Sequence, residues 1–206
     1  MQKFLIEDGI LKVYSGKEPV VVVPDGVTQI GGDVLEEDKK NERILVPSGG
    51  YKAFYSNKNL KELYLPDSVT EIGFKSLEQC TSLEVLSFSN KMKTFGCNAI
   101  NGCTALKKII YRGTMFEFTC LETPGQTPDL DVVFCTDGTI QFGKDREYYI
   151  DVLFFPGTRA EWEVQYPADD WRNRRCKYIV CSDESLERIR QKEKALQAIA
   201  RRKQNN

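Results

Sequence analysis

Residues 60–81 read LKELYLPDSVTEIGFKSLEQCT, and residues 83–104 read LEVLSFSNKMKTFGCNAINGCT. Aligned so that Leu60 matches Leu83, the two segments carry the same kind of side chain at many positions, and a third copy begins at Leu106. The agreeing positions are Leu63/Leu86/Ile109, Leu65/Phe88/Tyr111, Ile72/Phe95, Leu77/Ile100, Gly73/Gly96, Cys80/Cys103 and Thr81/Thr104. Agreement at so many positions predicts a stack of similar units that bury one shared core.

The same pattern continues upstream. Residues 21–31 (VVVPDGVTQIG) match residues 63–73 (LYLPDSVTEIG) in residue type. Between them, residues 44–47 (ILVP) are interpreted as the start of a further unit. This unit is shorter than the others, because fewer residues separate Pro47 from Pro66 than separate Leu60 from Leu83. Each unit is expected to hold a short strand, a Pro-Asp turn, an Ile-Gly return to the core and a helical turn. The predicted fold class is therefore an α/β repeat, a solenoid.

These segments resemble the BspA-like, Treponema-type class of leucine-rich repeats, and residues 4–11 (FLIEDGIL) resemble the leader that often precedes them. Two departures stand out: the shortened unit, and residues 33–36 (DVLE) in place of the usual Ala-Phe of the helical turn. The resemblance implies a short leucine-rich-repeat horseshoe. It also implies a binding module, of a kind that often acts at cell surfaces.

The chain is expected to begin with a hairpin and to end with a helix. Residues 4–14 alternate about Asp8-Gly9, a strong hairpin signal, so residues 1–19 are predicted to form an N-terminal β-hairpin cap over the bare edge of the first repeat. Repeats are assigned to residues 20–111. Residues 182–206 are predicted to form a basic C-terminal helix with Ser182 as its N-cap. Seven basic and four acidic residues lie between 183 and 206.

Residues 112–181 contain a second, longer repeat. Residues 111–118 (YRGTMFEF) parallel residues 155–162 (FPGTRAEW), and residues 132–138 (VVFCTDG) parallel residues 178–184 (YIVCSDE). Each copy is interpreted as a strand, a Gly-Thr turn, an aromatic residue, a polar loop and a second strand. The copies resemble the Gly-Thr-x-x-x-Trp tail module that closes many BspA-like arrays. They are predicted to form tandem β-rich modules that close the solenoid.

Catalytic, cofactor and metal sites are not expected. The chain has no histidine, which excludes Ser-His-Asp and Cys-His nucleophiles. Residues 138–145 (GTIQFGKD) approach a phosphate-binding loop, but Asp145 stands where a magnesium-binding hydroxyl is needed. The seven cysteines form no Cys-x-x-Cys pair, and an odd number without an export signal indicates free thiols. A cytoplasmic location is therefore expected, and no membrane segment is predicted.

The strand row supplies the candidate partner-binding residues. Side chains one place before each inner strand end face away from the core, and this row is Val22, Leu45, Tyr64, Ser87 and Ile110. The neighbouring row is Val20, Arg43, Glu62, Val85 and Lys108. Because a solvated face should be polar, the apolar first row is interpreted as a contact surface. The alternative is that the C-terminal modules or helix fold over it.

Two classes of function are consistent with the sequence. The first is a non-catalytic protein–protein interaction scaffold, an adaptor or an inhibitor of a larger protein or nucleoprotein assembly. The alternative is a carbohydrate-binding module or enzyme accessory domain. In that case the aromatic residues of the C-terminal half would form a sugar platform, namely Tyr148, Tyr149, Trp162, Tyr166 and Trp171. The basic run Arg201, Arg202 and Lys203 could contact nucleic acid, although it more simply complements the helix dipole.

Overall fold

The computed structural model describes residues 3–32, 52–121, 130–142, 148–191, 193–194 and 197, apart from the side chains of Tyr148, Tyr149 and Trp171. The chain divides into two compact units, Met1–Arg146 and Glu147–Asn206. The division falls between the two copies of the longer repeat, so each unit contains one of them.

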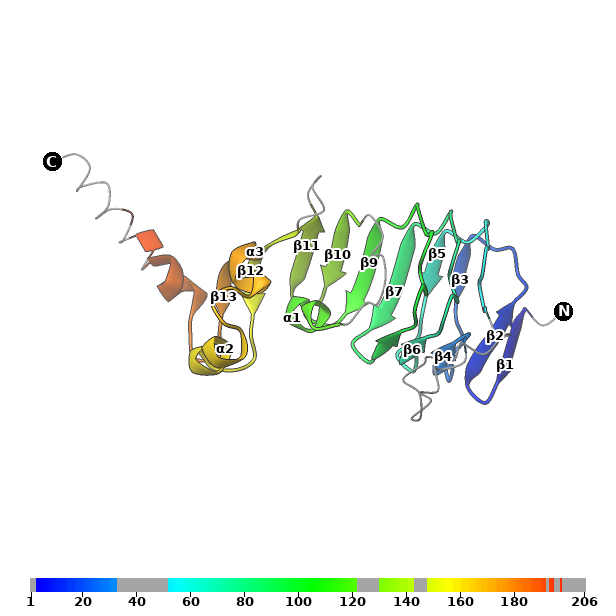
Figure 1. The fold of residues 1–206 in the computed structure, drawn as a ribbon, viewed down its shortest axis with the longest axis horizontal. Coiled ribbons are helices and arrows are strands. Elements are labelled where there is room, and N and C mark those ends of the chain that lie inside the picture. Colours follow the sequence, from blue (N-terminus) through cyan, green and yellow to red (C-terminus); the bar gives the residue numbers. More distant parts are fainter. Residues whose placement is uncertain are drawn as a thin grey trace, which may run out of the picture. The chain divides into compact units, whose positions relative to one another are not determined.

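The first unit is built on a row of parallel strands, seen side by side in Figure 1. The row runs through β3 (Val20–Val22), β5 (Glu62–Tyr64), β7 (Val85–Ser89), β9 (Lys108–Arg112) and β10 (Val132–Cys135), followed by antiparallel β11 (Gly138–Phe142). The central residues of these strands align in register and are buried, each no more than 5% exposed; they are Val21, Leu63, Leu86, Ile109 and Val133. The repeat spacing thus predicted the inward-facing positions of β3, β5, β7 and β9 correctly.

A second row of strands forms the opposite side of the core. It contains β1 (Phe4–Glu7), β2 (Ile10–Tyr14), β4 (Gln29–Ile30), β6 (Glu71–Ile72) and β8 (Thr94–Phe95). Their buried side chains meet those of the first row; the rings of Phe88 and Phe95, for example, are 5.4 Å apart between centroids.

The N-terminal hairpin joins this second row. β1 pairs antiparallel with β2 around Asp8-Gly9, and β2 pairs in parallel with β4. The sequence predicted a hairpin cap on the first repeat. The hairpin pairs with β4, the second-row strand of that repeat, whereas β3 is the end strand of the first row. The hairpin extends the second row because Leu11 lies in register with Ile30 and shares its buried environment.

The turns that return each repeat to the first row are stacked by hydrogen bonds that recur with the repeat period. The Phe54 amide donates to the Ser76 carbonyl (2.8 Å), as the Leu77 amide does to the Ala99 carbonyl (2.8 Å). Residues 52–60 are therefore equivalent to residues 75–83. Ala53 and Phe54, 2% and 1% exposed, are the Ala-Phe pair that the sequence interpretation placed at residues 33–36.

The sequence interpretation of a shortened unit is therefore wrong, because the extra residues are an insertion within one ordinary repeat. The chain from Val21 to Leu63 comprises one ordinary repeat, as long as that from Leu63 to Leu86, together with residues 33–51. β3 pairs directly with β5, so the strand row has no strand between them. Residues 33–51, including the expected unit start at 44–47, lie outside the described residues.

The described repeats contain strands and turns but no α-helix. Residues 74–79, which the sequence predicted as a helical turn, form consecutive turns. The fold is a sheet-rich repeat, and its description as an α/β solenoid with the curvature of a horseshoe stays a prediction. The α-helices in the described part of the chain lie in the two longer repeats and at residues 186–191, 193–194 and 197, within the predicted C-terminal helix; Ser182, its predicted N-cap, lies in a turn before the helix.

Both longer repeats are strand–helix–strand units, with helices in the segment interpreted from the sequence as a Gly-Thr turn, an aromatic residue and a polar loop. In the first, α1 (Met115–Thr119) connects β9 with parallel β10. In the second, α2 (Arg159–Gln165) and α3 (Trp171–Arg175) connect β12 (Tyr148–Phe154) with parallel β13 (Cys176–Val180).

The Gly-Thr motif begins a helix because its threonine is an N-cap. Thr114 with Glu117, and Thr158 with Glu161, form reciprocal capping boxes. The two copies also share a contact to the following strand end. The Met115 amide donates to Asp137 (2.7 Å) and the Arg159 amide to Asp183 (2.9 Å). The duplication predicted from the sequence thus has one hydrogen-bonding pattern, while its likeness to the tail module of BspA-like arrays stays a prediction.

One repeat position provides a test of backbone strain. Ser56, Gln79 and Gly102 follow one another at the repeat spacing, and all have left-handed backbones, with φ of 58°, 62° and 72°. Gln79 is exposed, so Gln79→Gly should raise the free energy of unfolding by about 0.5–1 kcal/mol, since a side chain costs about 1 kcal/mol in this region. Urea unfolding followed by circular dichroism measures the change. Gly102→Ala should lower stability instead, and a shift in the same direction for both variants would contradict the assignment.

Candidate functional site

The outer face of the first strand row is the candidate site. We define it by the two registers of side chains that flank the buried one. The first register is Val22, Tyr64, Ser87, Ile110 and Phe134, and the second is Val20, Glu62, Val85, Lys108 and Val132. Because side chains alternate along a strand, these residues lie on the side away from the core.

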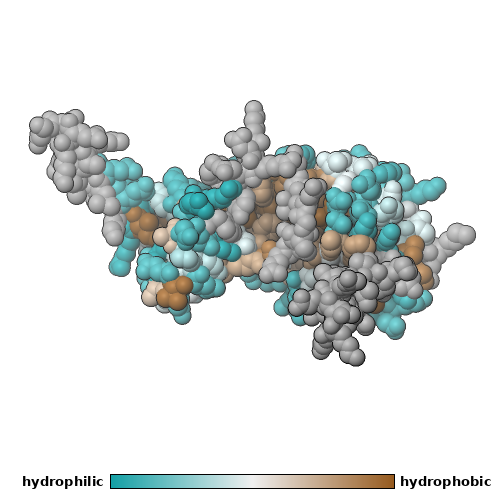
Figure 2. All heavy atoms as spheres, viewed as in Figure 1, coloured by the Kyte–Doolittle hydropathy of each residue, from teal (hydrophilic) through white to brown (hydrophobic). Residues whose placement is uncertain are grey.

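The exposed apolar side chains of this face gather at its two ends. Val20 and Val22 are 49% and 67% exposed on β3, and Phe134 is 43% exposed on β10. Tyr64 and Ile110 are half-buried beside them. Figure 2 shows apolar atoms in the region of β9, β10 and β11. The ladder hydrogen bonds hold the backbone under these side chains rigid. Binding a partner there would therefore order little additional backbone of the sheet, and the entropic cost of binding would be small.

The structure brings five of the seven predicted site residues onto this one face. Val22 lies directly opposite Tyr64, and Glu62 and Lys108 lie in the neighbouring register. Ile110 is three strands from Val22 along the row. The sequence placed Leu45 between Val22 and Tyr64, whereas the ladder joins those two directly. Leu45 and Arg43 lie outside the described residues. That the face binds a partner stays a prediction.

Phe134 and Val132 were missed. They continue the row because β10 pairs in parallel with β9, with Val133 opposite Ile109. The signal was present in the sequence: residues 132–134 (VVF) match residues 108–110 (KII) in their two last positions. The repeat spacing did not reveal it, since α1 and residues 120–131 lie between the two strands.

A polar cluster interrupts the row that the sequence predicted to be apolar. Arg112 reaches across β7, donating to Ser87 Oγ (2.8 Å), to the Leu65 carbonyl (2.7 Å) and to Asp67 Oδ1 (2.8 and 3.0 Å). Ser87 is consequently only 2% exposed, while the Asp67 side chain is 74% exposed. The face therefore consists of two apolar patches, one around Val22 and Tyr64 and one around Ile110 and Phe134, with an ion pair at the turn end.

Tyr64 is held in place within the face. Its hydroxyl donates to Glu62 Oε2 at 2.7 Å. This hydrogen bond to a carboxylate raises the pKa of Tyr64 above its ordinary value. The phenol is therefore neutral at physiological pH, and it presents an apolar ring with a satisfied hydroxyl, a residue type enriched in protein interfaces.

Two of the five aromatic residues predicted to form a sugar platform, Trp162 and Tyr166, are buried, while the side chains of Tyr148, Tyr149 and Trp171 lie outside the described part of the chain. Trp162 is 1% and Tyr166 8% exposed, and their rings pack against each other at 4.5 Å between centroids. The indole nitrogen of Trp162 donates to Asn173 Oδ1 (3.0 Å), and the Arg172 guanidinium lies 4.6 Å from the Tyr166 ring. These side chains form the core of the second unit. The cavity beside them, about 470 Å³, exposes little of either ring.

The thiols have packing roles where the structure describes their contacts. Cys80 and Cys103 are buried and donate to the carbonyls of Phe54 (3.0 Å) and Leu77 (3.1 Å), one repeat earlier. Burial raises the pKa of Cys135 and of Cys176 to about 12, so neither is a thiolate at neutral pH. Among the described residues, no group of three or more His, Cys, Asp or Glu side chains could hold a metal ion.

The comparisons with known proteins point to one family. The sequence profile described as BspA type leucine rich repeat region matches residues 17–119, in six copies. That segment is half of the chain and includes β3 to β9 and α1. No curated protein and no solved structure matches the chain. In the part of the chain that the structure describes, we find no helix with the length and apolarity needed to span a bilayer.

Proposed function

Because the chain belongs to the BspA-type leucine-rich-repeat family, we propose that it is a non-catalytic protein–protein interaction scaffold whose outer face binds another protein. Repeats of this family suggest an interaction module in general terms. Assigning the contact surface to the outer face goes further and is supported by the geometry of the strand row.

The observation that carries the proposal is the exposure of Val20, Val22 and Phe134 on one side of a hydrogen-bonded sheet. Single exposed apolar residues are common, but residues gathered on one rigid face are typical of binding surfaces. Charged and hydrogen-bonded groups lie between and beside the two apolar patches, with Lys108 in the second register and the Arg112–Asp67 ion pair at the turn end. Protein interfaces combine apolar contacts with polar groups of this kind.

A scaffold of this kind acts by occupying a surface of its partner. We therefore propose the role of an adaptor, or of an inhibitor that blocks a larger protein or nucleoprotein assembly. The basic residues Arg201, Arg202 and Lys203, which could contact nucleic acid, lie outside the described residues. Seven free cysteines favour a reducing compartment, so we place this activity in the cytoplasm.

The double variant Val22→Asp/Phe134→Asp tests the face. A charge in each apolar patch should cost about 2 kcal/mol or more of binding energy, roughly a 30-fold loss of affinity. Both side chains are exposed, so the free energy of unfolding should change by no more than about 0.5 kcal/mol. The measurement is quantitative affinity capture from the cytoplasmic fraction of host cells, followed by titration of the captured protein.

Val13→Asp is the matched control, because Val13 is 43% exposed and lies on the hairpin of the second strand row. It should leave capture unchanged. If the double variant captures the same proteins as the wild type with equal affinity, the outer face is not the binding surface. Capture only from a secreted fraction would contradict the cytoplasmic location.

A further inference from the structure

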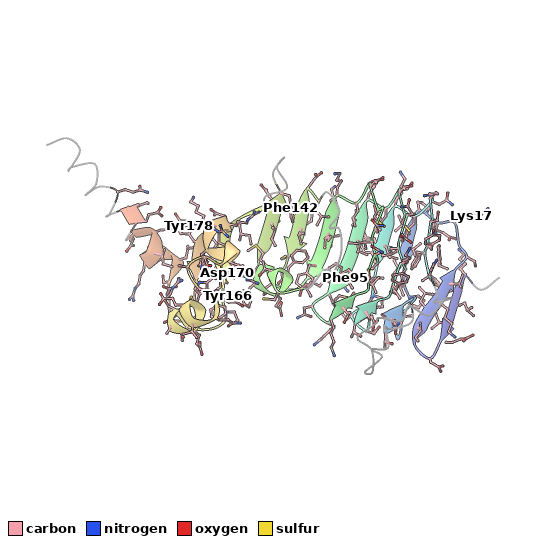
Figure 3. All side chains as sticks on the ribbon, in the orientation of Figure 1. Lys17, Phe95, Phe142, Tyr166, Asp170 and Tyr178 are labelled. Atoms are coloured by element: carbon pink, nitrogen blue, oxygen red, sulfur yellow. The ribbon has the colours of Figure 1, made fainter. Side chains whose placement is uncertain are left out.

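Two buried cysteines occupy equivalent positions in neighbouring turns of the first unit. Cys80 follows β6 and Cys103 follows β8, and they are 0% and 3% exposed. Figure 3 labels Phe95, in the strand β8 that leads into the second of these turns. Both cysteines are free thiols. The contacts of the two side chains place their sulfur atoms next to each other.

The two turns lie as close together as neighbouring strands of a sheet. Just before the two cysteines, the Gln79 amide donates to the Asn101 carbonyl (2.7 Å). Chains joined by such bonds are about 4.8 Å apart. The Cα atoms of disulfide-linked cysteines are separated by about 4.4–6.8 Å. The backbone therefore needs little movement to allow a bond between Cys80 and Cys103.

Both thiols point toward the preceding repeat. Cys80 Sγ donates to the Phe54 carbonyl (3.0 Å), and Cys103 Sγ donates to the Leu77 carbonyl (3.1 Å). The Leu77 oxygen also accepts the Cys80 amide (3.1 Å), so the Cys103 sulfur lies against the turn that holds Cys80. The two thiols are hydrogen-bonded to each other as well. A bond between the sulfur atoms thus requires a rotation of the side chains rather than a rearrangement of the turns.

The surroundings of the pair favour a thiolate at Cys80. The hydrogen bond between the two thiols lowers the pKa of Cys80 and raises that of Cys103. The Lys58 ammonium donates to the carbonyl of Gln79 (2.9 Å), and its charge also lowers the pKa of Cys80. A thiolate is the form of cysteine that attacks an oxidant. The pair therefore contains a reacting thiol and a second thiol in contact with it.

We propose that Cys80 and Cys103 are a peroxide-sensitive pair that forms a disulfide between neighbouring repeats. The Cys80 thiolate attacks hydrogen peroxide and breaks its O–O bond; one oxygen leaves as water, and the other stays on the Cys80 sulfur as a sulfenic acid. The Cys103 thiol then attacks the Cys80 sulfur. The S–O bond breaks, the S–S bond forms, and the second oxygen leaves as water with the Cys103 proton. The two sulfurs lose two electrons in total, and the peroxide gains them.

Peroxide can reach the pair from the surface of the turns. Gln79, directly before Cys80, is exposed, and so is Thr104, directly after Cys103. A local opening of one turn admits a molecule of this size without unfolding the unit. The disulfide then joins two repeats covalently, and it should stabilise the first unit because it restricts the unfolded chain.

Peptide mapping of the full chain, with Cys97 and Cys120 replaced by serine, tests the proposal. Both of these thiols are exposed, so their removal leaves the described surface without a competing thiol. The folded protein is treated with hydrogen peroxide, the remaining thiols are alkylated, and the chain is digested with trypsin without reduction. We expect a linked peptide that joins residues 76–91 to residues 94–107. It should be at least about 10-fold more abundant than any other linked pair, because the two thiols are held in contact.

The serine variants identify the sulfurs that react. Cys80→Ser and Cys103→Ser keep a hydrogen-bond donor, and each should abolish the link, whereas Cys176→Ser removes a buried thiol outside the pair and should leave the link unchanged. In the linked protein the urea midpoint of the first unit should rise by about 1 M and fall back after reduction with dithiothreitol.

The proposal is overturned if peroxide leaves Cys80 and Cys103 of the folded chain as alkylatable thiols. A link that forms only in urea would overturn it as well, since the folded turns would then not present the pair to the oxidant. So would a rise in the urea midpoint that persists in Cys80→Ser. Capture of a partner by the outer face is measured on the reduced chain, so each of these results leaves the proposed function to its own test.

Discussion

Replacing Gly73 with alanine is expected to lower the free energy of unfolding of the first unit by about 3 kcal/mol. A Cβ atom at this position would lie 2.4 Å from the Gly31 carbonyl oxygen and 2.7 Å from the Gly32 Cα. These are backbone atoms of the neighbouring repeat, so no side-chain rotation relieves the contact. The two turns would have to separate, which would break the bond from the Gly73 amide to the Ile30 carbonyl (2.9 Å).

Gly26→Ala is the control for this substitution. It adds the same methyl group, but nothing lies within 4 Å of its Cβ, so only the backbone preference changes and the cost should be about 1 kcal/mol. Urea unfolding and amide hydrogen exchange of residues 62–72 measure both variants. Equal losses for the two alanines would show that the repeats do not approach as closely as described.

The repeat core was predictable because every unit places the same position in the same environment. Leu63, Leu86 and Ile109 agree in the sequence and are buried in register in the structure. The insertion was not predictable from local pattern, since residues 44–47 read like the start of a unit. The insertion is recognised only from the hydrogen bonds that the amides of residues 54 and 56 donate to the next repeat. These bonds join segments far apart in the chain, so the local sequence pattern does not reveal them.

The candidate face was predictable only in outline. Alternation along a strand placed Val22, Tyr64 and Ile110 on one side, as the ladders have them. The polar cluster depends on Arg112 spanning the distance to a carbonyl two strands away, which residue type does not specify. The helices of the longer repeats could have been found, because Thr114-Met-Phe-Glu117 and Thr158-Arg-Ala-Glu161 are capping-box sequences.

Trp162→Ala is expected to destabilise the second unit by about 3–5 kcal/mol, enough to unfold a small domain. The ring is 1% exposed and contacts Phe155 at 5.2 Å and Tyr166 at 4.5 Å between centroids. Alanine would leave a cavity. It would also remove the indole N–H that donates a hydrogen bond to the Asn173 side-chain oxygen. Trp162→Phe keeps most of the packing and should cost less, about 1–3 kcal/mol.

Thermal unfolding followed by far-ultraviolet circular dichroism, with amide exchange of residues 150–180, distinguishes a core tryptophan from a ligand platform. Val164→Ala is the control, because Val164 is 87% exposed on the same helix and should change stability by no more than about 0.5 kcal/mol. A platform residue would behave in the opposite way, since its removal abolishes sugar binding while the fold keeps its stability. If Trp162→Ala unfolds at the wild-type temperature, the ring is not part of the core and the carbohydrate-binding alternative regains its main residue. If stability falls as expected, Trp162 and Tyr166 stabilise the core of the second unit. The outer face of the first strand row then remains the candidate binding surface.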